Sequence, residues 1–348
     1  MIQSIYELNK TKYGVTIVAD KIIKAVIVTG PTATGKTALG CKLAMFFDGE
    51  IISADSRQVY KGLDIGTGKD LAEYSLQGGT IPYHLIDIVD PNSEYNLRHF
   101  NHDAYEQIAL TSSRNKLPIV VGGTPLYIDS LISDYDFPLA APDYELRKMI
   151  GSQSVEEMGE YIKRNFPEVY EQIDNKHSRP RLVRILENFL GHGGKDFSKE
   201  QGVFNIKYKW LILGAFFDRK EVHSRIERRL DERIDHGMIE EVANLNKSGV
   251  SWDRLDSFGL EYRYVSMYLQ GRIKFDEMRN TLLARIRRFA RSQDIWFRKI
   301  ENKGHKIYWI PKADFYEAKE IVTAFLSNKD MPEPKIRLKD IYYGKKTQ

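Results

Sequence analysis

Residues 24–37, KAVIVTGPTATGKT, decide the fold of this chain. The run KAVIVT at 24–29 is apolar and β-branched and ends at Gly30, which is typical of a buried strand. Residues 30–37 then match the pattern G-x-x-x-x-G-K-S/T in full, and a helix is expected from Lys36 to about Phe47. A strand, a glycine-rich loop and a helix in this order predict a phosphate-binding loop.

Each residue type in this loop suits an anion. The glycines let backbone amides turn toward a phosphate, and the N-terminus of the following helix adds partial positive charge. Lys36 supplies a mobile positive charge, and the Thr37 hydroxyl suits a Mg2+ ion that bridges phosphate oxygens. We therefore expect Mg2+ as the cofactor, with Thr37 as its ligand. The residues expected to bind the phosphate groups of a donor are Gly30, Pro31, Thr32, Ala33, Thr34, Gly35, Lys36 and Thr37.

Strands and helices are predicted to alternate around this loop. The segments EIISAD at 50–55 and LPIVVGG at 117–123 are apolar runs typical of strands, and 97–115 between them has a helical pattern. After a helical stretch, KYKWLILGAFF at 207–217 returns to strand character. This order predicts an α/β fold, a P-loop NTPase-like parallel sheet covered by helices. The later part of the chain is expected to add helices at 219–247 and 275–302, and a strand-helix pair at 306–327.

The pattern also predicts a helical insertion domain inside the sheet domain. After Pro138 the segments 143–150, 154–164 and 180–191 have helical patterns, and 191–202 is expected to be a flexible loop. A length of 348 residues favours two domains. The expected division is an N-terminal arm at 1–23, the first part of the core at 24–137, the helical insertion at 138–205, the second part of the core with C-terminal helices at 206–330, and a basic tail at 331–348.

Composition excludes several classes of protein. The chain is 42% hydrophobic and 29% charged, which is ordinary for a globular protein. No apolar run approaches the roughly 18 residues of a membrane helix, and the start MIQSIYELNK lacks the apolar segment of a signal peptide. Cys41 is the only cysteine, which excludes an internal disulfide and a cysteine-based zinc cluster. We expect a cytoplasmic protein that does not bind membranes, and no feature indicates a stable protein partner.

The distribution of charge is more informative than the net charge of +4. The stretch 176–184, KHSRPRLVR, holds four cationic side chains and no acid, and 285–298, RIRRFARSQDIWFR, holds five arginines against Asp294. The tail from Lys335 onward is basic again. Such local clusters fit contacts with a phosphate backbone. The alternative, solvated helix faces and a basic tail, stays open for each cluster taken alone.

The second predicted strand ends in an acid close to the phosphate loop. Asp55 follows that strand at the carboxyl edge of the sheet, where open α/β folds bind ligands. The strand at 117–123 ends in Gly-Gly-Thr and offers no carboxylate of the kind that holds Mg2+ in ATPases. An acid at a strand end can cap a helix or contact Mg2+, but this position favours a general base. Phosphate binding therefore does not predict ATP hydrolysis here.

Together these segments resemble the tRNA dimethylallyltransferase family, also called tRNA isopentenyltransferases. The match is collinear from about residue 24 to 327. It departs from the family at the helix that ends QDIWFR, where Ile286, Arg288 and Ser292 differ, and at GLEYR, where Glu261 stands in place of a small residue. The segments that carry the resemblance are GPTATGKT (30–37), SADSRQVYKGLDIGTGK (53–69), PYHLIDIVDP (82–91), GGTPLYI (122–128), APDYELR (141–147), RPRLVRILE (179–187), FDRKEVHSRIERRLDERIDHGMIEEV (217–242), GLEYR (259–263) and QDIWFR (293–298).

The resemblance implies a reaction and its catalytic groups. The family transfers a dimethylallyl group from dimethylallyl diphosphate to the exocyclic amine of the adenosine next to the anticodon in tRNA, and diphosphate leaves. Asp55 would orient that amine and take its proton. Thr124 would bind the diphosphate, and Arg263 would help to hold the leaving group.

The same resemblance implies tRNA as partner and the insertion at 138–205 as the tRNA-binding domain. The target base must leave its stack, and residues 56–58 would line the channel that receives it, with Arg147 near its far end. Arg181 and Arg184 lie three residues apart and share a helical face, as Arg287 and Arg291 do on their helix. The residues expected to contact tRNA are Asp55, Ser56, Arg57, Gln58, Thr124, Arg147, Arg181, Arg184, Arg287 and Arg291. For the arginines of 285–298 the alternative is salt bridges to the sheet domain.

Three other functions remain possible at this point. A prenyl transferase that uses free AMP would share the phosphate loop and Asp55, but the insertion and its basic stretch favour a macromolecular acceptor. A nucleotide kinase is disfavoured by the specific stretch SADSRQVY. An RNA-binding regulator without activity is disfavoured because the loop and Asp55 are both present.

Overall fold

The computed structural model describes residues 22–76, 79–133, 144–150, 153–173, 176–190 and 207–341. The chain forms two units, one of Met1–Ser133 with Asn205–Gln348 and a smaller one of Asp134–Phe204. Residues 1–21 of the arm expected at 1–23, the loop expected at 191–202 and the last seven residues lie outside the described residues.

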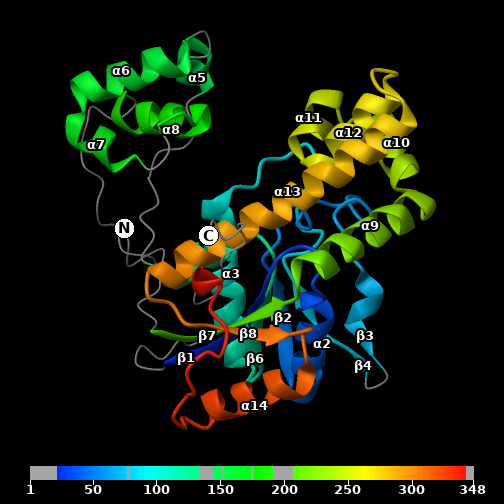
Figure 1. Ribbon diagram of the computed structural model, residues 1–348, viewed down its shortest axis with the longest axis vertical. Coiled ribbons are helices and arrows are strands. Elements are labelled where there is room, and N and C mark those ends of the chain that lie inside the picture. Colours follow the sequence, from blue (N-terminus) through cyan, green and yellow to red (C-terminus); the bar gives the residue numbers. More distant parts are fainter. Residues whose placement is uncertain are drawn as a thin grey trace, which may run out of the picture. The chain divides into compact units, whose positions relative to one another are not determined.

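A six-stranded parallel sheet forms the centre of the described part of the larger unit (Figure 1). This confirms the predicted fold class. The central strand β1 is paired with β6 on one side and with β7 on the other, so the phosphate loop leaves from the middle of the sheet. In spatial order the strands are β5 (Tyr83–His84), β2 (Gly49–Ser53), β6 (Leu117–Val121), β1 (Ile23–Thr29), β7 (Tyr208–Phe216) and β8 (Ile307–Pro311).

Strand β1 is apolar from Ala25 to Val28 because helices cover both of its faces. Ala25 and Ile27 pack in one cluster with residues of α3 (Leu97–Ser113) and α4 (Pro125–Ile132). The alternate residues of β1 pack in a second cluster with α2 (Lys36–Phe46). Successive side chains of a strand point to opposite faces, and burial on both sides produces the run that the sequence shows. The helix α14 (Phe315–Leu326) belongs to the same cluster as α2.

The helices after β7 form a second apolar core with the loop that follows β2. Val59 and Leu63 of that loop pack among these helices. The single helix predicted at 219–247 is wrong, because Gly237, with φ 97°, interrupts it. The long helix α13 was predicted correctly, and in Figure 1 it meets α12 at its start. These helices are α9 (Arg219–Asp235), α10 (Met238–Lys247), α11 (Trp252–Ser257), α12 (Leu260–Leu269) and α13 (Phe275–Asn302).

Residues 338–341, within the segment expected to be a basic tail, pack against α13. Leu338, in the short 3-10 helix Leu338–Asp340, is buried. The buried Glu301 accepts hydrogen bonds from the backbone N–H of Leu338 (3.1 Å) and of Lys339 (2.8 Å). Arg298 donates from Nε to the Leu338 carbonyl at 2.9 Å. This part of the basic segment is therefore bound through its backbone.

The smaller unit is helical where it is described. Its helices α5 (Tyr144–Ile150), α6 (Val155–Asn165) and α8 (Arg179–Leu190) confirm the three predicted helical segments. A short helix α7 (Pro167–Gln172) was not predicted, since six residues give too little periodicity. The unit has an apolar core of its own, made of Ile150, Met158, Ile162, Ile173, Leu182 and Leu186. No helix in the described ranges of the chain is long and apolar enough to cross a bilayer.

Candidate active site

A cavity of about 730 Å3 lies at the carboxyl ends of three neighbouring strands in the larger unit. The phosphate loop follows β1, Asp55 follows β2, and Thr124 follows β6. Since these strands are parallel and adjacent, their carboxyl ends bring the three segments together. Lys36, Thr37, Asp55 and Thr124 all line the cavity. Asp55 therefore lies beside the phosphate loop, at the edge of the sheet where it was expected.

The phosphate loop is held closed by contacts of its own and by α13. Lys36 donates from Nζ to the Pro31 carbonyl at 3.1 Å, and the Thr34 hydroxyl donates to the same oxygen at 2.8 Å. Gln293 of α13 accepts from the backbone N–H of Thr32 at 2.9 Å. Gly30 has φ 141°, and a Cβ there would lie 2.8 Å from a backbone oxygen of β7, so glycine is required. The loop is thus preorganised before any ligand binds.

Arginines of α9 bring further positive charge to the loop. Arg225 donates from Nε to the Ala33 carbonyl at 2.7 Å, and Arg229 donates to the Thr32 hydroxyl. Arg233 also lines the cavity. None of these three arginines was expected to be a site residue. Their spacing of four residues within RKEVHSRIERRLDER places them on one helical face, which is a signal that could have identified them.

The cavity holds these cations at an electrostatic cost. Burial, and after it the nearby Arg229, lower the pKa of Lys36 to about 8. Burial also lowers the pKa of Arg229 to about 9, with Arg233 as the next cause. A bound anion with several charges would relieve this repulsion. The site is therefore suited to a diphosphate.

Asp55 fixes the turn after β2 and lines the cavity at the same time. Its Oδ1 accepts the backbone N–H of Arg57 at 2.9 Å. The next amide, that of Ser56, donates to the Thr124 hydroxyl at 3.2 Å. The turn is thus bound to the strand-end residue of β6. A capping role and a role in chemistry are compatible for this carboxylate.

Ser56, Arg57 and Gln58 all line the cavity, as expected for channel residues. Gln58 already uses its side-chain amide within the protein: Nε2 donates to the Gly68 carbonyl at 3.0 Å, and Oε1 accepts from the Ser53 hydroxyl at 3.1 Å. A contact of this amide with an adenine edge would require it to exchange these partners.

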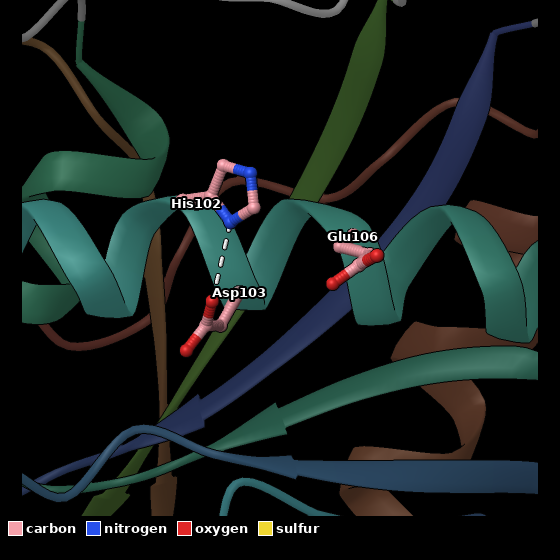
Figure 2. A group of neighbouring side chains, drawn as sticks. All are labelled: His102, Asp103 and Glu106. Atoms are coloured by element: carbon pink, nitrogen blue, oxygen red, sulfur yellow. Dashed lines mark hydrogen bonds and ion pairs between the residues drawn. The ribbon is translucent and has the colours of Figure 1, made fainter. Parts of the chain in front are cut away.

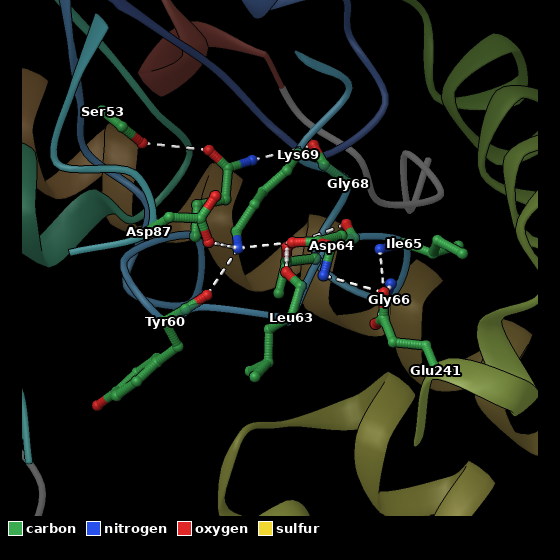
Figure 3. A network of polar contacts seen from close by, with 12 residues as sticks. Ser53, Tyr60, Leu63, Asp64, Ile65, Gly66, Gly68, Lys69, Asp87 and Glu241 are labelled. Atoms are coloured by element: carbon green, nitrogen blue, oxygen red, sulfur yellow. Dashed lines mark hydrogen bonds and ion pairs between the residues drawn. The ribbon is translucent and has the colours of Figure 1, made fainter. Parts of the chain in front are cut away.

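The loop at 63–69 contributes to the wall of the cavity. Figure 3 shows the polar contacts that hold this loop. Glu241 of α10 accepts three successive backbone N–H groups, from Asp64 (3.0 Å), Ile65 (2.6 Å) and Gly66 (3.1 Å). The buried Lys69 donates to the Tyr60 carbonyl at 2.6 Å and to Asp64 at 2.8 Å, and it also contacts Asp87. A loop with this many charged partners keeps its shape.

A second cavity, of about 360 Å3, adjoins the first. The two share lining residues Thr32, Ser56, Arg57 and Phe289. The second cavity is rich in aromatic rings, including Tyr60, Tyr95 and Phe258. Tyr60 and Phe258 lie with ring centroids 4.9 Å apart.

One group of side chains on α3 offers ligand atoms for a metal, and Figure 2 shows it. His102, Asp103 and Glu106 place possible ligand atoms within 4.8 Å of one another. His102 already contacts Asp103 at 3.2 Å, and Asp103 also accepts the Tyr95 hydroxyl at 2.9 Å. The group lines neither cavity, and we assign it no metal.

Comparisons with known proteins agree with this geometry. The model of the family described as IPP transferase matches residues 58–300, and that described as isopentenyl transferase matches residues 23–83. The chain belongs to the IPP transferase family. A protein named tRNA dimethylallyltransferase 2 from Shewanella sediminis is 44% identical over 298 residues, which cover 85% of this chain and 96% of that one. A protein named tRNA dimethylallyltransferase 1 from Syntrophus aciditrophicus is 41% identical over 295 residues, covering 85% and 96%.

A solved structure is similar over nearly the same length. It is the tRNA isopentenylpyrophosphate transferase of Bacillus halodurans, which is 30% identical and has a TM-score of 0.61. The match covers 88% of this chain and 96% of that one. These relatives confirm the family resemblance found from the motifs.

Arg263 is not where the family pattern led us to expect it. It lies on α12, about half exposed, and donates from Nε to Asp256 at 2.7 Å. It does not line the 730 Å3 cavity. In this structure the arginines next to the phosphate loop come from α9, so Arg225 and Arg229 become candidates for the leaving group beside Arg263, whose role stays a prediction.

Three of the expected tRNA contacts belong to the smaller unit, whereas the cavity belongs to the larger one. Arg147 contacts the buried Glu187 through Nε at 2.5 Å and Nη2 at 3.1 Å, and Arg184 contacts the same carboxylate at 3.1 Å. The expected place of Arg147 near the far end of the channel therefore stays a prediction. Arg181 is partly exposed on the same helix as Arg184.

The arginines of α13 divide between structure and surface. Arg287 forms an ion pair with Glu227 of α9 at 2.6 Å. A salt bridge was the expected alternative to a tRNA contact for this arginine, although the partner lies on a helix and not in the sheet. Arg291 is exposed. Of the two, Arg291 is the better candidate for a contact with tRNA.

Proposed function

We propose that this chain transfers a dimethylallyl group from dimethylallyl diphosphate to the exocyclic amine of the adenosine next to the anticodon in tRNA, and releases diphosphate. The observation that carries the proposal is one cavity that combines a cationic phosphate loop with Asp55 and Thr124. The relatives named tRNA dimethylallyltransferase support tRNA as the acceptor. Such an acceptor also supports the cytoplasmic location expected from the sequence.

The donor binds with its diphosphate in the phosphate loop. Negative charge grows on the diphosphate as the carbon–oxygen bond breaks, so fixed cations stabilise the transition state more than the bound substrate. Lys36, Arg225 and Arg229 supply these cations. Thr124, which follows the neighbouring strand β6, contacts the diphosphate from the same edge of the sheet.

Mg2+ suits this cavity because the lining offers hard oxygen ligands. The Thr37 hydroxyl is one, and the carboxylates of Asp70 and Glu73 line the same cavity. Thr37 would hold the ion next to the phosphate loop. When bound, Mg2+ neutralises part of the charge on the leaving diphosphate.

The acceptor adenosine leaves its stack and meets the donor at Asp55. Its exocyclic amine is a weak nucleophile that loses a proton on alkylation, and Asp55 takes that proton. The second cavity supplies the approach, since Phe289 lines both cavities, is 38% exposed and offers a ring face for stacking a base. Ser56 and Arg57 line both cavities and so contact both substrates.

One assay tests this function. Purified protein is incubated with labelled dimethylallyl diphosphate, Mg2+ and either bulk tRNA or AMP, with a chelator in a parallel arm. Label in tRNA that depends on Mg2+ supports the proposal. Label in AMP alone would mean an adenylate prenyl transferase, and no label in either would refute a transferase.

Asp55→Asn is the matched test of the base. The variant keeps the size of the side chain and an oxygen for the Arg57 amide, but it cannot take a proton. We expect transfer to fall by about 10²-fold or more, with the KM for the donor changed only a few-fold. Near-normal turnover would remove Asp55 from the chemistry.

A further inference from the structure

We propose that Glu261 is a positioning residue for transfer: its carboxylate holds Arg57 at the wall between the two cavities, where Arg57 meets the acceptor nucleotide. The inference rests on the proposed function and adds a residue to it. Glu261 is the residue of GLEYR that departs from the family pattern, and no motif assigns it a role.

Glu261 is a buried acid with two cationic partners. It lies in the first turn of α12 and is only 4% exposed. Its Oε2 lies 2.6 Å from Nη1 of Arg57, and its Oε1 lies 3.8 Å from Nη1 of Arg233. Burial by itself raises the pKa of Glu261, but Arg57 and Arg233 outweigh burial and hold that pKa below its usual value. The carboxylate is therefore ionised in the folded protein.

Arg57 occupies the boundary at which both substrates would be handled. It is one of the residues that line both cavities. The backbone of Gly259, just before α12, lies close to the Arg57 side chain. A Cβ on Gly259 would lie 3.4 Å from Nη1 of Arg57 and 3.6 Å from its Cδ. Gly259 also has φ 114°, a conformation that favours glycine. The turn before α12 is thus shaped around this one side chain.

Removal of the charge on Glu261 would leave two cations without their shared counter-ion. Arg57 and Arg233 would then repel each other inside the protein, and a truncated buried ion pair is strongly unfavourable. Arg57 would move from its place between the cavities. Arg233 is further from Glu261 and keeps its hydrogen bond to the Gly66 carbonyl, and Lys36 and Arg229 keep their own contacts with the phosphate loop, so the lining of the donor cavity stays in place. We therefore expect a substitution at Glu261 to change the KM for tRNA and not the KM for the donor.

The chain offers a matched control for Glu261→Gln. Glu50 is a second buried acid, 6% exposed, and it pairs with Arg114 at 2.5 Å and with His84 at 2.7 Å. It lines neither cavity. Glu50→Gln therefore reports the loss of a comparable ion pair without any effect on Arg57.

The experiment compares steady-state transfer to tRNA by the wild type and the two variants. We expect Glu261→Gln to raise the KM for tRNA about tenfold and to leave the KM for the donor within threefold, whereas Glu50→Gln changes neither, even if both lower the Tm. Equal effects of the two substitutions on the KM for tRNA would overturn the inference. A wild type without transfer would instead refute the proposed function.

A double-mutant cycle with Arg57→Ala gives an independent check. If Glu261 acts through Arg57, Glu261→Gln should have little further effect on the KM for tRNA once Arg57 is removed. If the two substitutions instead raise the KM for tRNA independently, so that their fold-changes multiply in the double variant, the inference is overturned. Should Glu261→Gln fail to fold, Glu261→Asp keeps the charge but shortens its reach, and it should show the same split between the two KM values.

Discussion

The substitution Gly68→Ala tests whether the fit of Arg233 into the cavity wall matters for donor binding. Gly68 has φ 68°, and a Cβ there would lie 1.7 Å from Nη2 of Arg233 and 2.9 Å from its Cζ. Two atoms cannot approach that closely. Arg233 is itself buried, 9% exposed, and donates from Nη1 to the Gly66 carbonyl at 3.3 Å. An alanine therefore forces this guanidinium from its position.

The expected loss of stability has two parts. A left-handed backbone costs a residue other than glycine about 1–2 kcal/mol. Loss of the hydrogen bond from the charged Arg233 to Gly66 costs about 1.5–3 kcal/mol more. We therefore expect Gly68→Ala to lower the free energy of unfolding by about 2.5–5 kcal/mol. Because Arg233 lines the donor cavity, the KM for the donor should rise as well.

Gly271→Ala isolates the contribution of Arg233. Gly271 has nearly the same backbone, φ 70°, but a Cβ there meets nothing within 4 Å. It lies outside both cavities. Urea unfolding of both variants, with donor kinetics on each, gives the comparison. Gly271→Ala should lose only the backbone part and keep the wild-type KM; equal losses in both variants would refute the role of Arg233.

Three further predictions concern charge. Because the pKa of Lys36 is about 8, Lys36 loses its charge above pH 8, and the KM for the donor should rise there by up to about tenfold per pH unit. Lys36→Arg should flatten this dependence of the KM on pH. An equally steep dependence in the variant would mean that Lys36 is not the group that titrates. Thr37→Ala should raise the Mg2+ concentration needed for half-maximal transfer while tRNA affinity holds, measured by Mg2+ titration and filter binding. Arg181→Gln should lower the slope of log affinity for tRNA against log salt concentration by about one, because one fewer phosphate contact is made. Arg184→Gln should mainly destabilise the helical unit around Glu187.

Local patterns predicted the elements around the phosphate loop well. The strands β1, β2 and β6 and the helices α2 and α3 were all expected, because each signal depends on a few consecutive residues buried against the sheet. Asp55 and Thr124 could be placed for the same reason: both follow strands, and parallel strands bring their carboxyl ends together. The break at Gly237 was missed because the apolar spacing continues on both sides of it.

The roles of the arginines could not be predicted from the pattern. Arg225, Arg229 and Arg263 all lie in segments that carry the family resemblance, but only the first two line the cavity. Which face a helix turns to a ligand depends on its packing against distant residues, here the core shared with Val59 and Leu63. A motif records which residues occur together and not which of them reach the substrate.

The stretch SADSRQVYKGLDIGTGK at 53–69 illustrates that difference. It identified the family, yet much of it maintains the shape of the cavity: Lys69 binds the Tyr60 carbonyl, Gln58 binds Gly68, and Glu241 binds three amides of the loop. Glycine at 68 is needed because Arg233 occupies the space of a side chain. Substitutions at Lys69 or Glu241 should therefore lower activity through the shape of the wall, and stability should fall together with activity.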